Sequence, residues 1–303
     1  MAQRYAVLLV VIASVCYGLL ATLTKLGLAG GLHVGQINGV QFIFGTILLW
    51  GTAIWKHRHW QKPSSRAILK LLAVGTLMGM TSAFYNAAIQ FVPASIAVVL
   101  LFQFVWIGVL YEWIFRRVAP NGQTLVSIAI SIVGALFAAD VFHGKLLQIS
   151  PAGVLLGLGA AFSYAGTLYT SGKVAMEVSS WLRGPIIATG GLAFILLLYP
   201  PVDLFKGAAW GGFWPLAGLL ALLGMLVPTL CLMFGTPPIS TGLTTVLGSA
   251  QLPVSVFMAW TIFAERVSGP QWLGVGLIIA GIVVAQWNRE AGGKPAGGSS
   301  LRM

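Results

Sequence analysis

The sequence predicts an all-α membrane protein of ten transmembrane helices, arranged as two inverted five-helix repeats. Three observations lead to this fold class. Hydrophobic residues make up 58% of the 303 residues and charged residues only 8%, about a third of the charge of a soluble domain. Apolar runs long enough to cross a bilayer recur along the chain. Several motifs of the first half also return in the second half at a nearly constant displacement.

The apolar runs place the ten helices. A bilayer core requires about 20 apolar residues per helix, and short charged or Pro/Gly-rich segments separate the runs that meet this length. The first run is too long for the core of a signal peptide, so we interpret it as a membrane helix. The predicted helices span 5–28, 36–55, 68–91, 94–115, 123–141, 152–173, 180–199, 213–234, 239–263 and 270–288.

The net charge of +11 does not indicate a nucleic-acid partner. The cations lie in short gaps between apolar runs, and no soluble basic domain is present to contact phosphates. Cys16 and Cys231 each lie inside an apolar run, so their spacing supports neither a disulfide nor a metal site. We therefore expect no metal and no cofactor.

The distribution of positive charge predicts the orientation. An even number of helices places both termini on one face, and most of the 17 Lys and Arg residues fall on that face. The exceptions are Lys25, Lys145, Lys206 and Arg266. Because cytoplasmic loops carry the excess of Lys and Arg, both termini are expected in the cytoplasm.

Residues of the first half recur in the second half just under half the chain further on. The recurring pairs are Tyr17 and Tyr164, Lys25 and Lys173, Gly79 and Gly224, Pro93 and Pro238, Gln103 and Gln251, and Gly134 and Gly281. A unit of five helices must enter the membrane from the opposite side in its second copy, and transporters commonly build two related states from such inverted repeats. The alternative is an old duplication that is retained only for folding. We divide the chain into repeats at 1–141 and 151–288, with a disordered tail at 289–303.

The stretch AQLPVSVFMAWTIFAERVSGPQWLGVGLIIAGIVV contains Pro253 in mid-helix, Glu265 at a helix end, and then Gly274 and Gly281. With these residues the chain resembles the EamA-type transporters of the drug/metabolite transporter superfamily, over nearly its whole length. The resemblance implies ten helices, a bacterial inner-membrane location and the export of metabolites. Within the family the chain is most similar to amino-acid exporters, including exporters of aromatic amino acids.

The first half departs from the pattern of this family. Val105 stands where a proline is common, and Gln41 takes a place where many members have arginine. Arginine also replaces a loop glutamate near Arg116 and Arg117. These departures leave the exact substrate open.

Polar and small residues recur at helical spacing within the runs 68–91, 152–173 and 239–263, so each set falls on one helix face. The glycines among them also suit close helix packing. The larger polar groups need partners in a dry interior, and the deeper aromatic rings offer stacking surfaces for an apolar or aromatic solute. The candidate substrate-binding residues are Tyr17, Ser82, Phe84, Tyr85, Asn86, Phe102, Gln103, Tyr164, Thr167 and Gln251.

Pro228 and Pro253 are candidate hinges. Each proline lacks a backbone N–H, so we expect the carbonyls of Gly224 and Ser249 to be free to bind a zwitterion. The alternative at either position is a kink without function.

No ionisable residue lies near the middle of a predicted helix, and a local ion pair with Arg116 accounts for Glu112. Coupled carriers usually retain an ionisable group inside the membrane. The sequence therefore predicts a carrier that works by alternating access and moves a small neutral or zwitterionic solute, an amino acid or similar metabolite, down its own gradient.

The alternatives are a proton-coupled drug or metabolite exporter, an intramembrane enzyme, and a receptor or scaffold. The sequence contains no His cluster, paired carboxylates or nucleophile motif, so we expect no catalytic residues. The oligomeric state is open.

Overall fold

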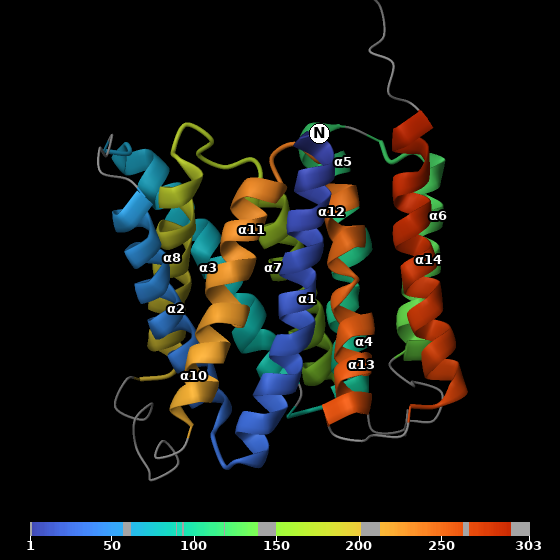
Figure 1. The fold of residues 1–303 in the computed structure, drawn as a ribbon, viewed down its shortest axis with the longest axis horizontal. Helices are drawn as coiled ribbons and strands as arrows, with labels where there is room; N and C mark the ends of the chain where they lie inside the picture. The colour runs from blue at the N-terminus through green and yellow to red at the C-terminus, as the bar shows by residue number, and fades with distance from the viewer. Residues whose placement is uncertain are drawn as a thin grey trace, which may run out of the picture.

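A computed structural model gives the arrangement of the helices, which run side by side with alternating direction (Figure 1). It describes residues 2–56, 62–88, 90–92, 94–117, 119–138, 150–200, 213–262 and 267–291, and within these ranges the regular elements are all helical. We call the end of the bundle where the chain begins the N-terminal face, and the other end the opposite face.

The first repeat contains α1 (Ala2–Ala29), α2 (Val34–Lys56), α3 (Ser65–Ala88), α4 (Ala94–Phe102), α5 (Phe104–Arg116) and α6 (Gly122–Ala138). The second contains α7 (Pro151–Ser171), α8 (Ser180–Leu198), α10 (Trp214–Ala221), η4 (Leu222–Leu226), α11 (Val227–Gly235), α12 (Thr241–Gly248), α13 (Gln251–Ile262) and α14 (Gly269–Ala291). Eight spans are long and apolar enough to cross a membrane, and two shorter apolar helices accompany them. The predicted all-helical fold is confirmed.

Three of the helices that the sequence predicts as continuous are interrupted. The run 94–115 divides into α4 and α5 at Gln103, and the run 239–263 divides into α12 and α13 at Ser249 and Ala250. These two interruptions lie at equivalent positions of the two repeats. Each repeat therefore has a broken fourth helix, in place of the continuous one that the sequence predicts.

The third interruption is a π-helical turn, η4, between α10 and α11. Pro228 follows it as the second residue of α11, and Pro253 is the third residue of α13. A proline removes the N–H that would bond to the carbonyl four residues earlier, so it is accommodated where the regular helical hydrogen bonding is interrupted. Both prolines therefore begin helical segments after an interruption.

The two repeats pack through equivalent helices. α6 packs against α14 and α2 against α8, and α3 packs on α7 and α8 much as α11 and η4 pack on α1 and α2. Glycines allow the close approach: a Cβ on Gly134 would lie 2.9 Å from the Gly274 carbonyl oxygen, and a Cβ on Gly79 would lie 3.0 Å from the Gly191 carbonyl oxygen. Membrane helices associate through such small residues, since burial of apolar surface contributes little in lipid.

Large apolar side chains cover the outside of the bundle. Trp55 is 77% exposed, Leu155 71% and Leu197 79%. Such exposure fits a protein whose outer surface contacts lipid. Pro93, Glu265 and residues 292–303 of the predicted tail lie outside the described residues, whereas α14 continues to Ala291 within that predicted tail.

Candidate substrate-binding site

A buried polar cluster joins α2 to α3. Ser82 Oγ and Asn86 Nδ2 both donate hydrogen bonds to Asn38 Oδ1, each at 3.0 Å. The four-residue spacing of Ser82 and Asn86 places both on one face of α3, and Asn38 is only 2% exposed. Both α3 residues are predicted site residues. Asn38 is not among the predicted site residues. It lies on the same face of α2 as Gln41, which follows it by three residues.

The amide of Asn38 retains a free donor. The oxygen of this amide accepts two hydrogen bonds, which fixes the orientation of the amide group and identifies the remaining atom as the donor nitrogen, Nδ2. Among the described residues Asn38 Nδ2 is buried and has no hydrogen-bond partner. An unsatisfied buried donor costs about 1–3 kcal/mol. A solute oxygen in this cluster would satisfy that donor.

A backbone carbonyl at the η4 interruption accepts a hydrogen bond from a side chain of α2. Gln41 Nε2 donates to the carbonyl of Gly224 at 3.1 Å, which is the carbonyl that Pro228 leaves without a helical donor. The expectation that the Gly224 and Ser249 carbonyls are free is therefore wrong: Gln41 donates to the first, and the N–H of Leu252 donates to the second at 3.2 Å. At this helix break the backbone forms a tighter turn, with a hydrogen bond between residues three apart. The N–H of Leu252 therefore takes the place of the N–H that Pro253 lacks.

Four aromatic rings from α1, α7, α5 and α4 form a line of successive contacts. The ring centroids of Tyr17 and Tyr164 lie 6.1 Å apart, those of Tyr164 and Phe104 4.7 Å apart, and those of Phe104 and Phe102 5.5 Å apart. All three pairs meet edge to face, which is a favoured geometry. Three of these four residues are predicted site residues, and the line brings them together from α1, α7 and α4. Phe104, fully buried in α5, was missed because it reads as an ordinary core residue.

Two predicted polar residues bond to their own helices instead. Gln103 Nε2 donates to the Val99 carbonyl at 3.0 Å, and Gln103 Oε1 accepts from Trp106 Nε1 at 2.8 Å. Thr167 Oγ1 donates to the Ser163 carbonyl at 3.0 Å. Both side chains therefore support the backbone locally, with Gln103 lying at the break between α4 and α5.

The remaining predicted residues lie at helix contacts. A Cβ on Gly159 would lie 3.0 Å from the ring of Phe84, so Phe84 packs on α7, while Tyr85 lies beside a small apolar cluster near the end of α3. Gln251 begins α13 where α1 passes, since a Cβ on Gly18 would lie 2.6 Å from the Gln251 carbonyl oxygen. The half-buried Gln251 side chain makes no hydrogen bond to any described residue. It is thus free to contact a solute.

In the described part of the chain, the two broken helices pack against each other through α5 and α12. α5 packs against α12, with Thr245 Oγ1 donating to the Val105 carbonyl at 3.1 Å and Gly108 facing the Thr245 methyl group. Inversion of the repeats would relate this contact to one between α4 and α13. Within the described residues no comparable packing joins α4 to α13, which lie on α7 and on α1 respectively. Figure 1 places α5 and α12 toward the N-terminal face, so the packing between the broken helices lies on that face.

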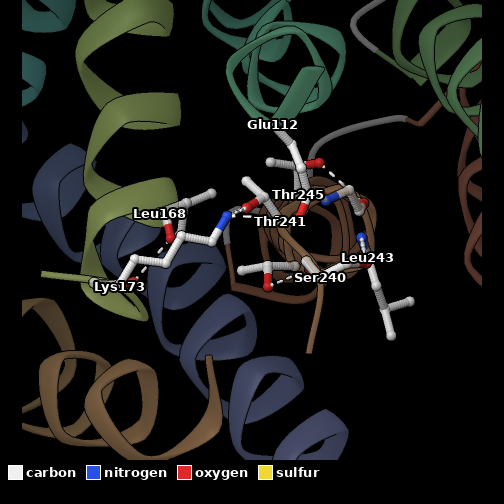
Figure 2. A network of polar contacts seen from close by, with 10 residues as sticks. Glu112, Leu168, Lys173, Ser240, Thr241, Leu243 and Thr245 are labelled. Atoms are coloured by element: carbon white, nitrogen blue, oxygen red, sulfur yellow. Dashed lines mark hydrogen bonds and ion pairs between the residues drawn. The ribbon is translucent and has the colours of Figure 1, made fainter. Parts of the chain in front are cut away.

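A charged cluster lies at the closed face (Figure 2). Lys173 Nζ lies 3.6 Å from Glu112 Oε1 and donates to Thr241 Oγ1 at 2.6 Å. The N–H of Gly242 donates to Glu112 Oε2 at 3.2 Å. The prediction of a local ion pair between Glu112 and Arg116 is therefore wrong among the described residues. Helical spacing permits that pair, but the tertiary fold brings the end of α7 and the start of α12 to the carboxylate.

Electrostatics around Lys173 are mixed. Burial lowers the pKa of its ammonium group, the carboxylate of Glu112 raises it, and the charge of Arg116 lowers it. The ammonium also lies 3.8 Å from the ring centroid of Tyr169, at cation–π distance. Separately, the described residues contain no group of three or more His, Cys, Asp or Glu side chains that is placed to hold a metal ion.

The EamA-like transporter family matches the sequence twice, at residues 4–139 and at residues 151–286. The chain is also 26% identical over 257 residues to a protein described as an uncharacterized inner membrane transporter, YedA, from Escherichia coli strain K12. This match covers 82% of the chain and 80% of the relative. YedA from Escherichia coli O157:H7 gives the same values.

The fold is similar to that of a protein in a solved crystal structure. The TM-score is 0.79, and the match covers 96% of this chain and 100% of the other. Since only 16% of the aligned residues are identical, this similarity concerns the fold alone.

Proposed function

Because the chain belongs to the EamA-like transporter family, we propose that it exports small neutral or zwitterionic metabolites across a bacterial inner membrane. Amino acids with apolar, aromatic or small neutral side chains are the expected substrates. Membership of a transporter family and the membrane-helical fold point away from an enzyme. The proposed mechanism is alternating access, in which the units 1–141 and 151–288 move against each other.

The observation that carries this proposal is the one-sided closure of the broken helices. α5 packs on α12 at the N-terminal face, whereas the pair related to it by the repeat, α4 and α13, is not joined by comparable packing in the described chain. Two inverted copies of one unit can exchange such packing. The alternative state would then join α4 to α13 and separate α5 from α12, which opens the N-terminal face.

Positive charge supports an orientation for this state. Because the cations concentrate at the N-terminal face, that face is expected in the cytoplasm. The arrangement in Figure 1 would then be closed toward the cytoplasm. Export requires the alternative state for loading, since the solute enters from the cytoplasmic side.

The substrate class follows from the polar cluster and the aromatic line. Asn38 Nδ2 is a buried donor without a described partner, and it suits the oxygen of a carboxylate. The rings of Tyr17 and Tyr164 offer apolar edges and faces to a side chain. No charged residue of the described chain lies midway along a membrane span, so a solute with a net charge would lack a counter-charge. A zwitterion with an apolar side chain fits these features.

Flux measurements on purified protein in liposomes test the proposal. We expect saturable uptake of neutral amino acids, better competition by phenylalanine or leucine than by dicarboxylates, and no accumulation driven by an imposed proton or sodium gradient. Dicarboxylate preference would overturn the neutral site, and gradient-driven accumulation would establish the proton-coupled or sodium-coupled alternative instead of facilitated diffusion.

A further inference from the structure

One carboxylate connects the two repeats at the closed face. Glu112 belongs to α5 of the first repeat, and its two oxygens engage different parts of the second: Oε1 lies 3.6 Å from Lys173 Nζ, and Oε2 accepts from the N–H of Gly242. The side chains of Lys173 and Glu112 are 22% and 12% exposed. This pair is therefore better shielded from solvent than an ordinary surface ion pair.

We propose that Glu112 and Lys173 form a latch that holds the N-terminal face closed, and that this latch breaks each time the face opens during transport. The inference rests on the proposed function, because it assigns two residues to a step of the alternating-access cycle. It gives Glu112 and Lys173 a role in conformational exchange and not in contacting the solute.

Glu112 stabilises the start of α12. The first N–H groups of a helix have no intrahelical acceptor, and the positive end of the helix dipole lies there. Ser240 Oγ accepts from the N–H of Leu243, and Glu112 accepts from the N–H of Gly242. α12 therefore receives one cap from its own chain segment and a second from α5. Separation of α5 from α12 removes the second cap together with the ion pair.

The position of Lys173 is itself fixed by a buried arginine. Arg183 is 1% exposed, and its Nη2 donates to the carbonyl of Ser171 at the end of α7. Ser171 Oγ in turn donates to Thr236 Oγ1 at 3.2 Å, beyond the end of α11. Lys173 follows this anchored helix end by two residues. Its ammonium group is thus presented to Glu112 from an anchored helix end.

The latch adds to the packing of α5 on α12. The packing of α5 on α12 uses Gly108, Val105 and Thr245, of which Thr245 contributes a hydrogen bond to the other helix. The charged pair lies outside this packing, nearer the N-terminal face, where α5 ends and α12 begins. Its loss is therefore expected to favour the open state without disturbing the interior of the bundle.

The test measures how often the closed face opens. A cysteine at Val109, a buried α5 residue 3.2 Å from a Cβ built on Gly242, reports opening through its labelling rate with a membrane-impermeant methanethiosulfonate. The background replaces Cys16 and Cys231 with alanine. Labelling is carried out in oriented vesicles with the N-terminal face outward and in detergent.

We expect Glu112→Gln and Lys173→Met to raise the labelling rate of this cysteine about tenfold, the change that corresponds to losing one charge-assisted hydrogen bond. Glu112→Ala should raise it further, because glutamine still accepts from Gly242 and alanine does not. Arg116→Gln, one turn along α5 from Glu112, is the matched control and should label at the parent rate. Gel filtration verifies that each variant is folded.

Unchanged labelling in both Glu112→Gln and Lys173→Met would overturn the latch. An increase in Arg116→Gln equal to theirs would also overturn it, because general loss of charge would then be the cause. The proposed function has its own readout in the same background: a Val109→Cys, Gly242→Cys disulfide joins α5 to α12. If the cross-linked protein still transports, alternating access fails, whatever the labelling shows.

Discussion

The two possible contacts between the broken helices, α5 with α12 and α4 with α13, differ although their segments are copies of one unit. When Gln103 is aligned with Gln251, the position of Glu112 falls on Trp260 in the second repeat. Glu112 binds the start of α12, whereas Trp260 is 47% exposed and its ring packs at 5.8 Å centroid distance against Phe257 and against Trp272. Lys173 has its counterpart in Lys25 of the first repeat.

This difference makes the two possible closures chemically unequal. The inverted repeat makes two closures possible, and each requires the same helix segments to approach. One closure has a carboxylate, Glu112, that caps a helix and pairs with a lysine, whereas the equivalent position of the second repeat holds Trp260. The described arrangement, closed at the N-terminal face, is the closure that has those contacts.

The largest expected effect comes from joining α5 to α12 permanently with a disulfide. A Cβ on Gly242 would lie 3.2 Å from Val109 Cγ2, so cysteines at both positions fall within disulfide distance. We expect oxidised Val109→Cys, Gly242→Cys protein to lose nearly all flux in liposomes and to regain it after reduction. Each single cysteine variant serves as the control, and flux that persists under oxidation would show that this face need not open.

A second test concerns the polar cluster, which lies toward the opposite face. Asn38→Leu removes the acceptor of Ser82 and Asn86 and the unpaired donor, all in a buried position. We expect transport to fall at least about tenfold and the unfolding free energy to fall by about 1–3 kcal/mol for the donors left unpaired. Ser82→Ala, which loses one hydrogen bond only, should retain most activity. Equal flux in Asn38→Leu and the parent would remove this cluster from the site.

A third test disturbs the packing of α5 on α12 without changing a charged residue. A side chain on Gly108 meets the methyl group of Thr245, so Gly108→Val should separate α5 from α12. We expect labelling of a cysteine at Val109 to rise by a few fold, less than about tenfold, because neighbouring side chains relax around added methyl groups. Gly122→Ala is the control, since a Cβ there meets nothing within 4 Å. A decrease in labelling would contradict the assigned direction.

The smallest expected effect is at the start of α13. Gln251 has a half-buried side chain without a hydrogen bond to the described residues, so its removal leaves no partner unsatisfied. We expect Gln251→Ala to raise the Michaelis constant for amino-acid flux by about threefold to tenfold, the contribution of one hydrogen bond, with an unchanged thermal midpoint. A wild-type constant would exclude Gln251 from solute contact.

The sequence predicted the fold because the fold depends on length and composition. Apolar runs such as 5–28 and 36–55 have no other stable environment than lipid, and the recurrence of Gln103 as Gln251 defined the repeat. The continuity of the broken helices was not predictable in the same way. Nothing in the residues around Gln103 breaks a helix by propensity, and the side chain of Gln103 instead bonds within the break after it has formed.

The candidate site was predictable only where a residue type demands a partner. Asn86 and Tyr164 stood out as polar groups in apolar helices, and both lie in the clusters that the structure forms. Their partners Asn38 and Phe104 did not stand out, since one lies near a helix end and the other resembles any core residue. Helical spacing says which face a residue occupies but not which helix faces it.

The sequence by itself thus determined that this chain lies in a membrane, how many segments cross it and that they form two inverted copies. Only the tertiary structure decided that Glu112 pairs with Lys173, and that in the described part of the chain α5 packs on α12 while no comparable packing joins α4 to α13. The physical reason is the separation along the chain over which each effect acts. Hydrophobicity and helical periodicity act between near neighbours along the chain, whereas the choice between two equivalent closures depends on side chains that lie in different repeats.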